Sequence, residues 1–230
     1  MPQIITQDGA TQSGTALGAS MNIPTLGTMT IQSNPNRLLV VRIQYFDAGT
    51  GRRTTNVTWG AGGIQALSLV KQQINTSWIT EIWTREAPLA TTSVVAITFS
   101  GAVRIVAGAN SLYNVRQGGN SIRGTASATG GTAVPSVTIP SAAYDVVLDS
   151  MASAGGAGVT ATVGANQSQN WNLSRGTAGA GVRGCASAEP GTTSVTMSWS
   201  LSARQNWAIA AISVVPVMSG ARLPMMGAGR

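Results

Sequence analysis

The chain has 230 residues, of which 9% are charged and 43% hydrophobic, and its basic excess gives a net charge of +7. Charge this sparse lies far below the roughly 25% of an ordinary soluble domain, while the apolar content excludes a disordered polymer. The absence of histidine and the single cysteine exclude histidine acid–base chemistry, a thiolate metal cluster and an intrachain disulfide.

The basic residues are 13 arginines and one lysine, and only Arg52 and Arg53 are adjacent. Nucleic-acid-binding proteins usually cluster their basic residues and interleave them with aromatic side chains. The spread of arginines therefore does not predict direct binding of nucleic acid.

The first part of the chain reads as an arm followed by a β half. Residues 1–27 are polar and Gly-rich, and we expect an N-terminal arm that contributes little to the core. Residues 28–115 alternate apolar and polar positions, most clearly at 78–86, and 37–47 forms a long apolar strand. Pro88 ends the strand before it because proline cannot donate to a ladder.

The second part of the chain repeats the first. Residues 116–135 form a connector rich in Gly, Ser and Thr, and 136–217 follow as the second half. The opening Ser136–Ile139 (SVTI) repeats Thr28–Ile31 (TMTI), and Leu38 and Val146 hold the same place in the strands that follow. We therefore expect two related β halves.

Helical periodicity is absent, and many short strands separated by Gly and Pro turns are typical of a sandwich or barrel. Each half holds about six expected strands, some of them too short for a complete sandwich. The sequence thus predicts an all-β fold, a jelly-roll-like β-sandwich over residues 28–217 built from both halves, with extended terminal arms. Two tandem immunoglobulin-like domains are the alternative.

The acidic residues do not form a predicted catalytic pair. Glu81 and Glu86 differ by five in one strand, so they point to opposite faces. Asp145 and Asp149 share a face but lie ~13 Å apart along a strand. We expect no catalytic residue, no metal site and no cofactor, and hence a protein that is not an enzyme. No apolar run approaches the ~20 residues of a membrane helix, so no membrane partner is expected.

Trp171 is the candidate for stacking on a ligand. The chain has six tryptophans, most of which we expect to fill a core otherwise made of small residues. Trp171 is flanked by the amides Asn170 and Asn172, which favours an exposed position where a sugar ring stacks.

Residues 218–230 are predicted to be a C-terminal assembly arm, because they match neither a strand nor a helix. Its apolar side chains suit a groove on a neighbouring subunit, and its arginines suit carboxylates or carbonyls there. The expected assembly contacts are Arg222, Leu223, Met225, Met226 and Arg230.

Three motifs carry a resemblance to a known type of protein: the strand opening at Asn36–Val41, Thr80–Trp83 running into Ala87-Pro88, and Val195–Trp199. They resemble Gly/Ser/Thr-rich β-sandwich proteins of bacteriophage virions, of the capsid-decoration or structural type, and are also similar to bacterial surface β-sandwich modules. The resemblance implies a structural or adhesive role and carries over no catalytic residue.

We therefore expect a self-assembling virion component, such as a capsid decoration protein, whose partners are copies of itself and other virion proteins. Such a protein is made in the host cytoplasm and resides in the virion. The alternative is a carbohydrate-binding or adhesive module at an extracellular surface.

Overall fold

The fold is all-β, and the computed structural model describes residues 1–25, 27–177 and 179–218. The strands of the first half are β1 (Thr6–Gln7), β2 (Gln12–Ile23), β3 (Met29–Thr30), β4 (Leu38–Phe46), β5 (Thr54–Trp59), β6 (Gln65–Ala66), β7 (Ser68–Asn75), β8 (Trp78–Glu86), β9 (Thr92–Ser93) and β10 (Val95–Tyr113). Those of the second half are β11 (Ile122–Gly130), β12 (Ser136–Pro140), β13 (Val146–Ser153), β14 (Ala161–Val163), β15 (Ser168–Arg175), β16 (Val182–Pro190), β17 (Ser194–Leu201) and β18 (Trp207–Val214). Short 3-10 turns lie at η1 (Ala61–Gly63) and η2 (Gly156–Gly158).

The two halves share one strand order. In the second half a five-stranded sheet, β11-β18-β13-β16-β15, faces a three-stranded sheet, β12-β17-β14. In the first half the order β2-β10-β4-β8-β7 repeats the five-stranded sheet. The long β10 belongs to both layers of the first half. Its first residues pair with β5 in the outer layer, and its later residues pair with β4 in the five-stranded sheet. In each half the first and last strands lie side by side, which is the jelly-roll-like closure.

The residue register agrees with the repeat. Leu38 in β4 pairs with Leu112 on one side and Glu86 on the other. Val146 in β13 pairs in the same way with Val214 and Pro190. The positions of β4 and β13 are therefore equivalent.

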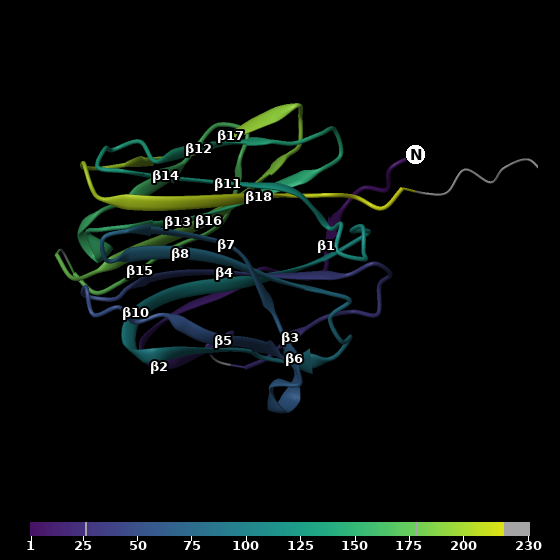
Figure 1. Ribbon diagram of the computed structural model, residues 1–230, viewed down its shortest axis with the longest axis horizontal. Coiled ribbons are helices and arrows are strands. Elements are labelled where there is room, and N and C mark those ends of the chain that lie inside the picture. Colours follow the sequence, from purple (N-terminus) through teal and green to yellow (C-terminus); the bar gives the residue numbers. More distant parts are fainter. Residues whose placement is uncertain (26, 178, 219–230) are drawn as a thin grey trace, which may run out of the picture.

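The two five-stranded sheets pack face to face, so the molecule has four layers (Figure 1). The layers run from β12 and β17 at the top, through β18 and β13 and then β8 and β4, to β5 and β2 at the bottom. In this packing β11 contacts β7, β15 contacts β2, and β13 contacts β4. Because β11 corresponds to β2 and β15 to β7, the halves are related by a pseudo-two-fold axis through β4 and β13.

The all-β sandwich expected from the sequence is confirmed, but its strands are divided differently. Each half is a complete sandwich with its own core, whereas the sequence indicated one sandwich built from both. The core of the first half surrounds Trp59, and that of the second surrounds Trp199. Further apolar clusters, which include Leu38, Val40 and Ile212, fill the space between the two sandwiches.

Residues 1–27, expected to form an arm, supply a strand of 12 residues to the sheet, although few of their side chains enter the core. They contain β2, which pairs with β10 over most of its length and buries Met21 and Ile23. The expected connector 116–135 likewise contains β11, which pairs with β18. Both are edge strands with many half-exposed positions, so their place in the sheets depends on backbone hydrogen bonds more than on apolar side chains. Most of the expected C-terminal arm, residues 219–230, lies outside the described residues.

A fully buried arginine, Arg42, occupies the space between the two sandwiches. Its Nη1 donates to the backbone carbonyls of Asp149 and Ser187, each at 2.9 Å. Its Nη2 donates to the side-chain carbonyl oxygens of Asn110 and of Asn170, the latter at 2.6 Å. A guanidinium of the first half thus joins β13, β15 and β16 of the second.

The exposed position expected for Trp171 is wrong, because its side chain is 3% exposed. The ring lies beneath the Arg42 guanidinium, 4.5 Å from its central carbon to the ring centroid. The indole Nε1 donates to Gln44 Oε1 at 3.3 Å. Trp171 is therefore part of the contact between the sandwiches. Burial lowers the pKa of Arg42 to about 10, against the opposing effect of the Asp149 carboxylate.

We expect Arg42→Met to destabilise the chain by about 3 kcal/mol, because buried acceptors on both sandwiches lose their donor. Urea denaturation followed by tryptophan fluorescence measures the change. The exposed Arg204 provides the control, and Arg204→Met should stay within about 0.5 kcal/mol of wild type. Equal denaturation midpoints for the two variants would show that the Arg42 contacts contribute nothing.

Candidate functional site

The acidic side chains of this chain are mostly occupied by structural hydrogen bonds. Six of the seven accept hydrogen bonds at separate places in the fold: Asp8, Asp47, Glu81, Glu86, Asp145 and Asp149. Asp149, for example, accepts from Trp199 Nε1 at 2.6 Å and from the Ser187 hydroxyl at 2.8 Å. Within the described ranges, no three Cys, Asp or Glu side chains gather as a metal-binding group would.

Two clefts lie at the margin of the contact between the sandwiches. We name the first the apolar cleft; its volume is ≈ 470 Å³, and its lining comprises Ile4, Ile5, Tyr144, Asp145, Val146, Ser168, Ala188, Glu189 and Pro190. We name the second the polar cleft; its volume is ≈ 370 Å³, and its lining comprises Ser68, Val70, Thr84, Arg85, Glu86, Gly119, Ser121 and Ile122.

The two clefts are equivalent positions in the repeat. Ser168 pairs with Ala188 across β15 and β16, just as Ser68 pairs with Thr84 across β7 and β8. The far wall of each cleft is the segment that leads into the first strands of the opposite half, with Ile4 and Ile5 in the apolar cleft. The pseudo-two-fold axis therefore relates the two clefts, and the side chains that line them differ.

Glu86 ties a neighbouring loop to the polar cleft. Its Oε2 accepts hydrogen bonds from the backbone N–H groups of Gly118 and Gly119, at 2.8 and 3.1 Å. Both glycines have φ +77°, a conformation that glycine adopts without strain. Desolvation raises the pKa of Glu86, but hydrogen bonds from Ser121 and from these two N–H groups outweigh it, so that the pKa lies below its usual value.

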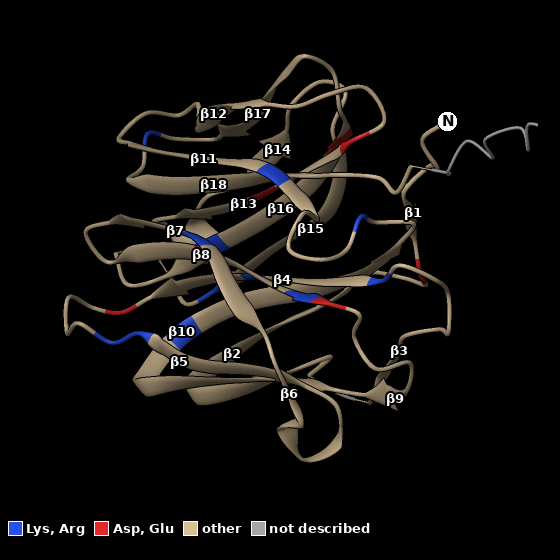
Figure 2. Ribbon diagram, turned by 45° about the vertical axis from the view of Figure 1, so that its right-hand side comes forward, with Lys and Arg blue, Asp and Glu red and all other residues tan. Residues whose placement is uncertain are grey.

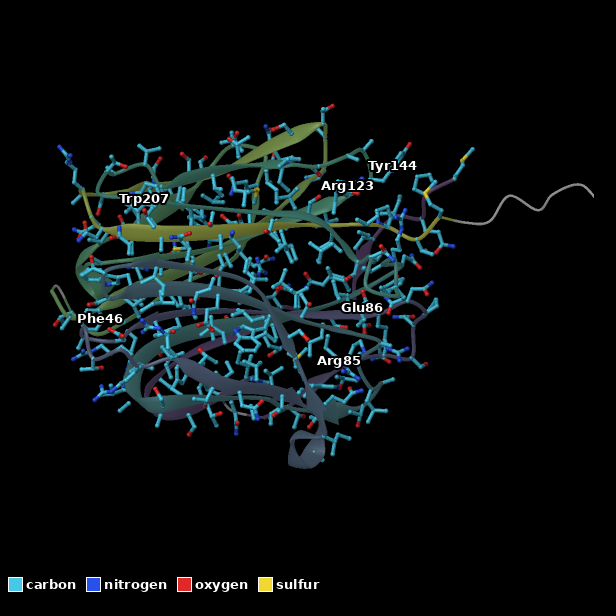
Figure 3. All side chains as sticks on the ribbon, in the orientation of Figure 1. Phe46, Arg85, Glu86, Arg123, Tyr144 and Trp207 are labelled. Carbon is cyan, nitrogen blue, oxygen red and sulfur yellow. The ribbon has the colours of Figure 1, made fainter. Side chains whose placement is uncertain are left out.

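The apolar cleft is lined mainly by apolar side chains. Ala188 stands where the polar cleft has Thr84, and Pro190 stands where it has Glu86. Ile4 and Tyr144 line the cleft with 74% and 58% of their surfaces exposed. Figure 3 shows Tyr144 beside Arg123 at the end of the molecule that carries the N-terminus. The apolar cleft therefore opens to solvent with exposed apolar groups at its rim.

Tyr144 is held in a left-handed backbone conformation, with φ +73°. The equivalent residue of the first half is Asn36, with φ +54°. Asparagine tolerates this region, whereas a tyrosine there costs of order 1 kcal/mol. A strained tyrosine therefore stands where the first half has an asparagine that tolerates the conformation, which points to a role for the ring at this rim.

The residue after Tyr144 fixes the turn. Asp145 accepts from Arg123 Nε at 2.5 Å and Nη2 at 3.1 Å, and also from the Ser213 hydroxyl at 2.8 Å. The hydrogen bond to Asp145 raises the pKa of Arg123. Because the buried Asp145 carboxylate is held from several sides, the Tyr144 ring is presented from a rigid turn.

Glu189 differs from the other six carboxylates. Its Oε2 is buried and makes no hydrogen bond with any described residue. Burial raises its pKa, and the nearby Asp149 carboxylate adds to the increase. Glu189 pairs with Val147, as Arg85 pairs with Leu39 in the first half, so equivalent positions carry opposite charges.

The sequence did not indicate either cleft, because each is made of segments far apart in the chain. It did contain one usable signal, a tyrosine in a turn whose counterpart in the repeat is asparagine. The expected assembly contacts lie outside the described residues: Arg222, Leu223, Met225, Met226 and Arg230. No helix in the described part of the chain is long and apolar enough to cross a bilayer.

The two glutamates near the clefts should give opposite pH effects when neutralised. The folded pKa of Glu86 is lowered below 4.5, so its stabilisation is present above that pH and is lost as pH falls through the folded pKa. The folded pKa of Glu189 is raised above 4.5, so its contribution is present below that pH and is lost as pH rises. Relative to wild type, Glu86→Gln should therefore lose more stability near about pH 7 than near about pH 3. Glu189→Gln should instead become more stable relative to wild type as the pH rises from about 3 to about 7.

Urea titrations of the two variants and wild type at several pH values test this expectation. Each variant serves as the control for the other, since both remove one carboxylate charge. Parallel stability profiles for the two variants would contradict the assigned directions.

Tyr144→Asn should stabilise the folded chain by about 0.5–1 kcal/mol, because asparagine tolerates the left-handed conformation better than tyrosine. Thermal or urea unfolding gives the change directly. The matched variant Asn36→Tyr places the same ring in the equivalent turn and should be destabilised. A loss of stability in Tyr144→Asn would mean that packing of the ring outweighs the strain.

Comparison with protein-family models, curated proteins and solved structures finds no match for this chain.

Proposed function

We propose that this chain is a non-enzymatic structural protein that assembles with copies of itself or joins a larger assembly, as a capsid decoration protein does in a phage particle. The observation that carries the proposal is the concentration of exposed apolar side chains where the first and last described residues meet. Pro2 and Met218 form an antiparallel bridge there, and Gln3 N–H donates to the Val217 carbonyl at 3.0 Å.

This end of the molecule combines several features of an interaction surface. Ile4, Tyr144 and Met218 have 74%, 58% and 55% of their surfaces exposed. Ile4 and Tyr144 also line the apolar cleft. Exposed apolar groups gathered around a concave site are typical of protein interaction surfaces.

The distribution of charge supports a partner bound through apolar contacts. Figure 2 shows basic and acidic residues distributed over many strands and loops rather than gathered on one face. Recognition of nucleic acid usually relies on a basic patch or stripe. A protein partner, and in particular another copy of this chain, fits the surface better.

A carbohydrate-binding or adhesive role is the second candidate, favoured by the exposed Tyr144 ring at the rim of the apolar cleft. Aromatic side chains offer an apolar face together with a polar hydroxyl, which suits a sugar. Binding on a glycan array that is lost in Tyr144→Asn would favour this role over assembly.

Purified chain should form larger species as its concentration rises from about 1 to about 100 µM, because the exposed apolar end becomes buried between copies. Sedimentation velocity measures the size distribution, and negative-stain electron microscopy shows whether the species are rings, shells or filaments. Assembly should persist at higher salt, since screening weakens the repulsion between copies that each carry a net charge of +7. A chain that stays monomeric over this range and forms no particles would contradict self-assembly.

A further inference from the structure

The apolar cleft has the properties of a docking site without an occupant among the described residues. Its volume of ≈ 470 Å³ lies within the range of ligand pockets, roughly 300–1,000 Å³. Its lining includes Ile5, Val146 and Pro190, and its rim carries the strained Tyr144. An occupant with apolar side chains is therefore the chemical match.

The chain itself contains a segment of this chemistry. After Met218 come twelve residues, 219–230, with the run Leu223-Pro224-Met225-Met226 and no acidic residue. Methionine and leucine fill irregular apolar sites, and methionine adapts its shape readily. Extended, twelve residues span at most about 40 Å, which is enough to reach from one copy into another.

The direction of the chain at residue 218 decides which copy is reached. Because Met218 is bridged to Pro2 in an antiparallel pair, the chain at Val217–Met218 runs in the direction from Gln3 to Pro2. The cleft lies on the other side of this pair, where Ile4 and Ile5 form its wall. A segment of the same copy would have to reverse its course to enter the cleft, whereas a segment from a second copy would not.

We propose that the apolar cleft of each copy binds residues 219–230 of a second copy, with the Leu223–Met226 run against Tyr144, Ile4 and Pro190. The inference rests on the proposed function and names the contact that produces assembly. Donor and acceptor are different surfaces, so two copies either exchange their segments reciprocally in a two-fold dimer or join head-to-tail into a ring or filament.

The polar cleft is not a second acceptor. At the positions of Ala188 and Pro190 it presents Thr84 and Glu86, and an apolar segment placed there would desolvate both polar side chains. Gly119, from the loop held by Glu86, is itself part of its lining. Each copy therefore offers one acceptor site, although the fold contains two equivalent clefts.

A disulfide between two differently tagged full-length variants tests the contact. Ser168→Cys places a thiol in the exposed wall of the apolar cleft, and Met226→Cys places one in the donor segment. The native Cys185 is fully buried and does not compete. When the two variants are mixed under mild oxidation, we expect a disulfide-linked pair that contains one chain of each tag.

The matched control uses the equivalent position of the polar cleft. Ser68→Cys is also exposed, and Ser68 pairs with Thr84 as Ser168 pairs with Ala188. It should give at least about tenfold less cross-linked product with Met226→Cys. Equal yields from the two clefts, or no product from Ser168→Cys, would overturn the proposal.

Tyr144→Asn tests the same contact independently, in a chain without an introduced cysteine. We expect association about tenfold weaker than wild type, while the free chain is at least as stable as wild type. A synthetic peptide of residues 218–230 should dissociate wild-type assemblies and have less effect on the residual assemblies of the variant.

These experiments distinguish assembly through a different contact from the absence of assembly. Assembly that persists in Tyr144→Asn, resists the peptide and gives no Ser168–Met226 cross-link would reject the contact and keep a self-assembling protein. A chain that neither assembles nor cross-links would reject both. A cross-link that forms only within a Ser168→Cys/Met226→Cys double variant at high dilution would assign the segment to its own copy and overturn the exchange between copies.

Discussion

The arrangement of the whole molecule depends on one buried guanidinium. Arg42 is fully buried between two five-stranded sheets, and it donates to acceptors on β10, β13, β15 and β16. A charge in that position is costly unless each of its partners is in place, so the sheets can slide or rotate only by breaking several hydrogen bonds together. The apolar clusters on either side bury apolar surface between the sandwiches. Apolar contacts are not directional, so they alone do not define how one sheet is oriented against the other. The pseudo-two-fold placement of the clefts therefore depends on this contact, together with the hydrogen bonds that Gln44 and Thr80 make to Ser150.

The repeat provides two equivalent sites, and a few substitutions make one of them different. Alanine and proline replace threonine and glutamate on the cleft wall, and tyrosine replaces asparagine in the adjoining turn. Each change removes polar groups from the apolar cleft or adds apolar surface to it. The tyrosine does so at the expense of backbone strain, while Glu86 binds a loop in the polar cleft and so serves the fold. Comparison of the two halves thus separates residues that build the sandwich from those that distinguish its sites.

Much of the fold could be predicted from the sequence, because the buried central strands carry strong apolar patterns. The equivalence of Leu38 and Val146 is an example, and it is kept in the register of both sheets. The edge strands β2 and β11 could not be predicted, because half-exposed strands rich in Gly, Ser and Ala resemble loops in sequence. Trp171 was misplaced because its flanking amides suggest solvent, whereas Asn170 and Asn172 bond to Arg42 and Arg183. The apolar cleft was beyond prediction, since its walls come from four segments separated by up to 186 residues, from Ile4 to Pro190.

The charge of the chain bears on how copies meet. Within the described residues, direct ion pairs join Arg53 to Asp47 and Arg123 to Asp145, and most of the other basic residues there form no direct ion pair. Copies that each carry +7 repel one another over a Debye length, which is about 10 Å at 0.1 M salt. A short apolar segment that reaches across this distance makes contact without bringing the two charged bodies fully together. In the proposed contact, repulsion keeps free copies dispersed at low concentration, and the apolar run supplies the attraction once a neighbour is within reach.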